Sequence, residues 1–158
     1  MAYEAWTAGE VDANSPWGSD AATKNKSNTD FLEAITGTRI ILTPADFVAN
    51  GVAAATYGLV NGYLSAVTTV FYAQLHIPAG YKVTHAKLYG DDATNTFEVF
   101  ACDITDGTTE DSLGAACNVN TEKDLTDDDS SATNYISIKW SCGNTDQLFG
   151  GYLTIARI

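Results

Sequence analysis

From Thr68 to the C-terminus, apolar and polar residues alternate in short runs that end at polar turns. The clearest run covers residues 68–77, where every second residue from Phe71 to Ile77 is apolar. The intervening positions include Tyr72, Gln74 and His76. A period of two, with β-branched and aromatic residues, is the spacing of a strand that buries one face. The pattern therefore predicts a half-buried β-strand here.

The same alternation continues along the chain. Residues 46–51 are expected to form a turn or a brief helical piece, and residues 106–132 mostly loop, with a short strand near 115–119. Closely spaced strands with no long helix favour an all-β fold, an antiparallel β-sandwich or jelly roll. Further strands are predicted at residues 38–42, 81–89, 95–104, 135–140 and 152–158, with a weaker one within 57–63.

Alternation also predicts which side chains form the core. Ile136, Ile138 and Trp140 share one strand face, which we expect to be buried. The same argument places Phe71, either Phe97 or Phe100, and Phe149 in the core. Several tyrosines could form an amphipathic surface of the kind that protein interfaces enrich, or could be ordinary sheet-face residues half covered by loops. These tyrosines are Tyr57, Tyr63, Tyr72, Tyr81 and Tyr89.

Residues 1–37 differ from the rest because they are polar, rich in turn residues and without a hydrophobic period. They nevertheless contain Trp6 and Trp17, whereas freely disordered segments are poor in aromatics. We expect an extended N-terminal arm that lies on its own sandwich or, the favoured alternative, on a neighbouring subunit. The predicted organisation is an arm at 1–37 followed by a β-sandwich at 38–158.

The charge is strongly acidic and unevenly placed. Of a net charge of −12, the window from Asp91 to Asp129 holds twelve acidic residues and one basic residue, Lys123. Such a field repels phosphate backbones, so nucleic acid is not an expected partner. No apolar run is long enough to span a membrane, and the N-terminus does not have the pattern of a secretory signal. We therefore expect a soluble protein that is made in the cytoplasm, with acidic loops exposed to solvent.

The chain offers few groups for catalysis. His76 and His85 flank a corner at 78–80, where hairpin pairing could bring them together, although tolerated strand histidines are the simpler interpretation. Nucleophile and phosphate-loop motifs are missing, so neither an enzyme nor a cofactor is expected. Carboxylates at predicted strand ends are weak candidates for calcium, without EF-hand spacing to support them. They are Asp91, Asp92, Asp127, Asp128 and Asp129, together with Asp103 and Asp106.

The three cysteines are Cys102, Cys117 and Cys142, and their spacing does not match a metal-ligand motif. Thiols of a reducing compartment are expected, with a bridge between Cys102 and Cys142 conceivable after release into an oxidising medium.

Five segments carry a resemblance to a known class of protein. They are Arg39-Ile-Ile-Leu-Thr-Pro-Ala-Asp-Phe47, Ile77-Pro-Ala-Gly-Tyr-Lys-Val-Thr-His-Ala-Lys-Leu-Tyr-Gly90, Phe97-Glu-Val-Phe100 with Asp103-Ile-Thr-Asp-Gly107, and Gly150-Gly-Tyr-Leu-Thr-Ile155. In these, the chain resembles small virion structural proteins of tailed bacteriophages, notably of marine and cyanobacterial phages. The resemblance implies a β-sandwich on the virion surface, commonly homotrimeric, as decoration protein, head fibre or tail component. It implies no catalytic residues.

The function expected from this resemblance is a capsid decoration (cement) protein in the virion, which stabilises the head through subunit contacts. Its partners would be the major capsid protein or other virion proteins. The expected interface residues are Trp6, Trp17, Tyr72 and Tyr81. The alternative is a receptor- or carbohydrate-binding tail fibre or tip domain, in which exposed aromatic rings stack on sugars. A glycosidase has little support, because the sequence does not show which acids face one another.

Overall fold

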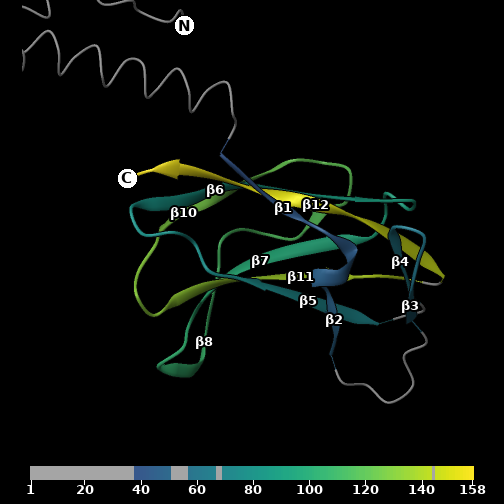
Figure 1. Cartoon of the computed structure of the whole chain (residues 1–158), viewed down its shortest axis with the longest axis horizontal. Coiled ribbons are helices and arrows are strands. Elements are labelled where there is room, and N and C mark those ends of the chain that lie inside the picture. The colour runs from purple at the N-terminus through teal and green to yellow at the C-terminus, as the bar shows by residue number, and fades with distance from the viewer. Residues whose placement is uncertain (1–37, 51–56, 67–68, 144) are drawn as a thin grey trace, which may run out of the picture. The chain divides into compact units, whose positions relative to one another are not determined.

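A computed structural model describes residues 38–50, 57–66, 69–143 and 145–158. These residues form two antiparallel sheets that pack as a β-sandwich (Figure 1). The predicted all-β class and antiparallel sandwich are therefore confirmed. Among the described residues no helix has the length and hydropathy needed to cross a bilayer. Trp6 and Trp17 lie outside the described residues, so the predicted arm stays a prediction.

The first sheet, called sheet A, is built around the last strand of the chain. In the order of pairing it contains β10 (Lys123–Asp129), β6 (Tyr81–Gly90), β12 (Asp146–Arg157), β4 (Tyr63–Ala66) and β3 (Tyr57–Val60), while β1 (Arg39–Leu42) also pairs with β12.

The second sheet, called sheet B, is centred on β11 (Asn134–Ser141), which lies between β5 (Val70–Leu75) and β7 (Thr96–Asp103). The sheet is completed by β2 (Val48–Ala49) beside β5, and by β8 (Asp106–Ser112) and β9 (Cys117–Asn118) beside β7. A short 3₁₀ helix, η2 (Pro44–Asp46), lies between β1 and β2 in the chain. The turn or helical piece predicted at 46–51 overlaps this helix only at Asp46, and residues 48–49 form strand β2.

The core lies between the two sheets and contains the side chains that alternation had assigned to it. Trp140 is fully buried, and its ring centroid lies 5.4 Å from that of Phe71 on the neighbouring strand. Ile136 and Ile138 are buried on the same face of β11. Of the two alternatives on β7, Phe97 is the core residue and Phe100 is half-buried on the outer face.

The weak strand signal at 57–63 corresponds to a hairpin of β3 and β4. Asn61 and Gly62 form its two-residue turn, and both have positive φ, at 44° and 95°. Two positive values in succession are the backbone of the turns that match the twist of paired strands. Asparagine and glycine adopt that backbone at low cost, which explains why the chain turns here.

The expectation of loop over most of 106–132 is wrong, because β8, β9 and β10 all lie in that window. These strands pair with the rest of their sheet along one side only. In β10 the buried side chain is Leu125, surrounded by exposed or half-exposed polar residues. An edge strand with so little buried surface has almost no hydrophobic alternation, so its sequence looks like a loop.

The predicted core position of Phe149 is also wrong, since 48% of its surface is exposed. Phe149 is the extra residue of a bulge, because Leu148 is opposite Gly90 and Gly150 is opposite Tyr89. Gly150 has φ of +109°, and a Cβ there would lie 2.4 Å from the carbonyl oxygen of Leu42 in β1. Gly150 and Gly151 lie within β12 and do not precede it. The missing side chain at Gly150 allows β1 to approach β12 closely.

The three cysteines are thiols in this structure. Cys102 is opposite Tyr135 at the start of β11, whereas Cys142 follows the end of that strand. Seven strand residues separate these positions, roughly 23 Å, so the conceivable bridge between them is excluded in the folded protein. Cys142 donates a hydrogen bond to the carbonyl of Thr69, and burial raises the pKa of its thiol.

We predict that Trp140→Ala lowers the free energy of unfolding by about 3–5 kcal/mol, because it empties a fully buried aromatic site. Phe149→Ala is the matched control and should cost about 1 kcal/mol or less, since half of that ring faces solvent. Urea titration of both variants measures the two values. Equal losses would contradict the assignment of inner and outer faces.

Candidate functional site

The outer face of sheet B, here called the B face, carries alternating aromatic and polar side chains. The cross-strand register fixes two rows: Tyr72 beside Lys139 and Glu98, and Gln74 beside Ser137 and Phe100. Their neighbours along each strand are core residues, so the pleat directs these side chains away from the core. The B face is thus a flat surface of rings, amides and charges on rigid strands.

Three strand ends meet at one edge of this face. β5 ends at Leu75 and is followed by His76, β11 begins at Asn134, and β7 ends at Asp103. Because these neighbouring strands are antiparallel, the end of β5 and the end of β7 both lie beside the start of β11. Residues that are far apart in sequence are therefore brought together by the register alone.

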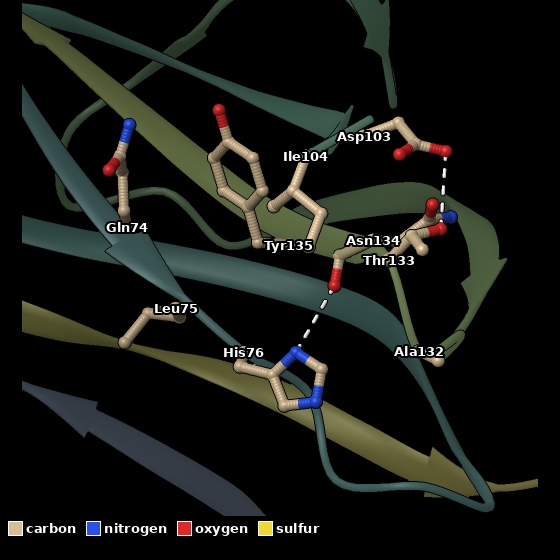
Figure 2. Close-up of a pocket in the computed structure, with 9 residues that line it drawn as sticks. All are labelled: Gln74, Leu75, His76, Asp103, Ile104, Ala132, Thr133, Asn134 and Tyr135. Carbon is tan, nitrogen blue, oxygen red and sulfur yellow. Dashed lines mark hydrogen bonds between the residues drawn. The ribbon is translucent and has the colours of Figure 1, made fainter. Parts of the chain in front are cut away.

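This edge contains a depression of about 560 Å³, the first depression (Figure 2). Figure 2 shows Gln74 and Tyr135 extending in the same direction from neighbouring strands, with His76 below them. Tyr135 is half-buried, while Gln74 and His76 are exposed. The full lining is Gln74, Leu75, His76, Asp103, Ile104, Ala132, Thr133, Asn134 and Tyr135.

Hydrogen bonds hold the polar groups of the first depression in place. The His76 ring donates from Nδ1 to the carbonyl of Asn134 at 3.2 Å, which leaves Nε2 on the far side of the ring. The backbone N–H of Ile104 donates to the carbonyl of Thr133 at 2.9 Å, joining the two loops that form one wall. The lining is thus preorganised by contacts between the strand ends.

Asp103 is the carboxylate of this lining. Its Oδ1 accepts the backbone N–H of Thr105 at 2.8 Å and the Thr105 hydroxyl at 2.7 Å, and its Oδ2 accepts the Thr133 hydroxyl at 3.2 Å. The backbone N–H of Thr105, followed by the Thr105 hydroxyl, holds the pKa of Asp103 below its ordinary value. A negative charge is therefore fixed at the rim at neutral pH.

A second depression of about 570 Å³ lies beside the first and shares Gln74 with it. Its other walls come from Tyr72 of β5 and from the chain around β2: Asp46, Val48, Ala49 and Asn50. The carboxylate of Asp46 accepts the backbone N–H of Thr43 at 2.7 Å and the Thr43 hydroxyl at 2.8 Å. This depression, like the first, combines one tyrosine, one amide side chain besides Gln74, and one anchored carboxylate.

Two groups of the weak calcium candidates, 91–92 and 127–129, are kept apart. Asp127, Asp128 and Asp129 pair with the start of β6, whereas Asp91 and Asp92 follow its end, roughly 30 Å away along the strand. Asp127 binds Lys82 at 2.5 Å, and Asp92 accepts two hydrogen bonds from Thr94. The antiparallel pairing of β10 with β6 therefore separates the two groups.

Three of the candidates, Asp103, Asp106 and Asp128, do meet: with Asp111 they line a third depression of about 320 Å³. Burial, followed by the charges of Asp129 and Asp111, raises the pKa of Asp128. Within the described ranges, no group of three or more histidines, cysteines and acids has metal-binding geometry.

The expectation that His76 and His85 could meet is wrong, because His85 lies on β6 in sheet A and His76 follows β5 in sheet B. Of the expected interface residues, Tyr72 lies on the B face, whereas Tyr81 begins β6 and packs against the core. Tyr89, on β6, shares no surface with Tyr72. The tyrosines considered as one surface are thus divided between the two sheets.

Sequence reasoning missed Tyr135, Asn134 and Gln74 as site residues. The available signal was the polar half of the alternation in 135–140. Tyr135, Ser137 and Lys139 alternate with the core residues of β11, and of these three Tyr135 and Lys139 are half-buried while Ser137 is buried. That pattern indicates an outward face, but it does not say that His76 and Asp103 lie next to it. Among the described residues that line the first depression, Asp103 is the one acid, and glycoside hydrolysis uses a pair.

Comparisons with known proteins gave solved β-sandwich structures. No family model and no curated protein matches the chain. The CBM22-1 xylan-binding domain of Paenibacillus barcinonensis Xyn10C is 12% identical, with a TM-score of 0.41, covering 77% of this chain and 97% of that one. The CBM36-1 domain of a xylanase from the hindgut metagenome of Trinervitermes trinervoides is 11% identical, with a TM-score of 0.39, covering 76% and 98%.

A third solved structure, TmCBM61 in complex with β-1,4-galactotriose, is 12% identical, with a TM-score of 0.36, covering 78% of this chain and 93% of that one. At these identities and TM-scores the similarity carries no argument about ligand or function.

We predict that the pKa of the Asp103 carboxyl lies below the ordinary value for aspartate, and that Thr105→Val raises this pKa only part of the way, because the backbone N–H remains. Carboxyl ¹³C shifts measured by NMR give the values. Thr94→Val, which removes the equivalent hydroxyl from Asp92, is the control and should leave Asp103 unchanged.

The lowered pKa of Asp103 makes the stability of the fold depend on pH. Asp103 stabilises the fold above its unfolded pKa, and this contribution is lost as the pH falls through the folded pKa. A measured pKa at or above the ordinary value for aspartate would contradict the hydrogen bonding described.

Proposed function

We propose that this protein is a carbohydrate-binding domain and that the sugar binds on the B face, at the first depression. The observation that carries the proposal is the combination of Tyr135 with Gln74 and His76 at the joined ends of neighbouring strands. A half-buried aromatic ring and exposed planar polar groups face one shallow space. This is the alternative function expected from the sequence, now supported by a specific surface.

The chemistry of sugars suits such a surface. A pyranose has one face of C–H groups, which packs against the negative face of an aromatic ring, and a rim of hydroxyls that donate and accept hydrogen bonds. Side-chain amides offer both donors and an acceptor, and an ionised carboxylate accepts from hydroxyls. Tyr135 supplies the ring, Gln74 an amide and Asp103 the carboxylate.

The rigid setting favours binding as well. Tyr135, Gln74 and Asp103 belong to paired strands, and the loops between the strand ends are hydrogen-bonded. Little conformational entropy is then lost when a ligand binds. This matters because sugar hydroxyls must also give up their hydrogen bonds to water, so the net gain from binding is small. A largely preformed concave site with a few placed polar groups is typical of small-molecule recognition.

We predict that Tyr135→Ala weakens binding at least about tenfold, the effect of losing roughly 1.4 kcal/mol of ring contact. An array of neutral plant and bacterial polysaccharides identifies a bound glycan, and isothermal titration measures its affinity for each variant. The matched control is Tyr89→Ala, a tyrosine on sheet A that is 40% exposed.

Thermal unfolding checks that both variants are folded. The proposal is rejected if the wild-type protein binds nothing on the array, or if Tyr89→Ala and Tyr135→Ala weaken binding equally.

A second candidate function, the capsid decoration protein expected from the sequence, is favoured by a different surface. The outer side of sheet A contains an exposed apolar patch, the A patch, in which Tyr63 and Phe149 pack edge to face at 6.5 Å. Exposed apolar residues gathered in this way are typical of protein contacts. The patch also includes Val60, which is opposite Tyr63, and Ile41 and Tyr89, all at least 40% exposed.

In this second proposal the A patch contacts another copy of the chain in a homotrimer, or the major capsid protein, and the protein is part of a virion. The two proposals use different faces, so a virion protein that binds a surface glycan satisfies both. The expected interface residues Trp6 and Trp17 remain part of this proposal.

We predict that Phe149→Asp converts an oligomer of the full chain to monomers while leaving glycan affinity within about twofold, because the charge lies on sheet A. Sedimentation velocity measures the oligomeric state, and Asp111→Asn, an exposed position on β8, is the control for altered charge. A wild-type monomer, or an oligomer unaffected by Phe149→Asp, would exclude the A patch as a self-contact.

A further inference from the structure

The two depressions of the B face lie in a line along β5. Tyr72 lines the second depression, Gln74 lines both, and His76 lines the first. These three residues are spaced by two along the chain, so the line from Tyr72 to His76 is roughly 13 Å long at the rise of an extended strand. That length exceeds a single aromatic ring, and hence a single pyranose, which is of similar width.

The groups along this line repeat. Each depression has one tyrosine, Tyr135 in the first and Tyr72 in the second, and the amide of Gln74 lies at the junction. Each also has a further side-chain amide, Asn134 or Asn50. The backbone N–H of Asn50 donates to the carbonyl of Val70 at 2.9 Å, which ties the second wall to β5. A polymer of similar units would meet similar side chains in each of the two depressions.

The charges of the B face select among such ligands. Within the described ranges, sheet B contains one basic residue, Lys139, and its ammonium is bound to the carboxylate of Glu98 at 2.7 Å. Asp103 and Asp46 place one anchored carboxylate in each depression. The other described basic residues belong to sheet A: Arg39, Lys82, Lys87, Lys123 and Arg157.

Sugars with carboxylate, sulfate or phosphate groups would therefore meet negative charge on the B face, where the lysine ammonium is already bound to Glu98. A buried or half-buried unpaired anion is costly, and repulsion from a fixed carboxylate adds to that cost. Uncharged hydroxyls, by contrast, can donate to Asp103 and Asp46.

We propose that the ligand is an uncharged polysaccharide, bound as a run of several sugar units along β5 across both depressions, with Gln74 contacting the chain at the junction. This inference rests on the proposed carbohydrate-binding function and specifies its substrate class. In this arrangement Tyr72 is a second stacking residue. Tyr135 contacts the sugar chain in the first depression, whereas Tyr72 contacts it in the second.

The test is isothermal titration of the full chain with β-1,4-linked gluco-, xylo- and galacto-oligosaccharides, each as a length series from disaccharide to hexasaccharide. Affinity in at least one series should rise at least about tenfold with length. Tyr72→Ala should remove most of that rise while changing disaccharide affinity less than about threefold. Gln74→Ala should weaken every length that binds, and Tyr89→Ala is the control for a tyrosine outside the line.

The charge is tested with the same gluco- and galacto-oligosaccharides after oxidation of C6 to the carboxylate. The oxidised forms should bind at least about tenfold more weakly, and the deficit should shrink at high salt, where charges are screened. Binding of the neutral series should not depend on salt.

Different results would contradict the extended site along β5 and the carbohydrate-binding function. Binding that does not increase beyond the disaccharide, or a length effect untouched by Tyr72→Ala, overturns the extended site and leaves the carbohydrate-binding function standing. Equal binding of the oxidised forms overturns the selection by charge. No binding of any neutral series in these titrations overturns the further inference, and if the polysaccharide array is also negative the proposed function fails with it.

Discussion

The structure depends on one row of aromatic side chains across the inner face of sheet B. Trp140 of β11 is directly opposite Phe71 of β5 on one side and Phe97 of β7 on the other, and all three are buried. A strand has a period of two, so a slip of one residue in either pairing would expose part of this row and bury polar neighbours. The burial of three large rings therefore sets the register of the central strands.

Everything on the outer face follows from that register. With Trp140 opposite Phe71, Lys139 must lie opposite Tyr72 and Ser137 opposite Gln74. The same alignment brings the end of β5, the start of β11 and the end of β7 to one edge, where the first depression forms. The positions of the candidate site residues therefore follow from packing in the core. No local sequence motif is needed to place them.

The two sheets differ in charge as well as in sequence. Basic side chains gather on sheet A, and some of them are paired with acids of its edge strand, as Lys82 is with Asp127. On sheet B, Glu98 holds the ammonium of Lys139, and the strand-end carboxylates are satisfied by backbone N–H groups and threonine hydroxyls. Such neutral donors stabilise an ionised carboxylate while leaving the surrounding surface negative. The outer face of sheet B is therefore negative, whereas sheet A carries most of the described basic residues and several exposed apolar side chains.

The sequence by itself determined the fold class, the central strands and the buried row, because alternation is a local property that a strand with one buried face must show. It indicated which residues of 135–140 face outward but not what lies beside them. The tertiary structure alone decided that His76 and His85 belong to different sheets, that Phe149 leaves the core at a bulge, and that acidic segments form the edge strands β8 and β10. It also assembled Gln74, Asp103 and Tyr135 into one site. Neighbours across a sheet are chosen by long-range packing, and edge strands bury too little apolar surface to leave a pattern in the sequence.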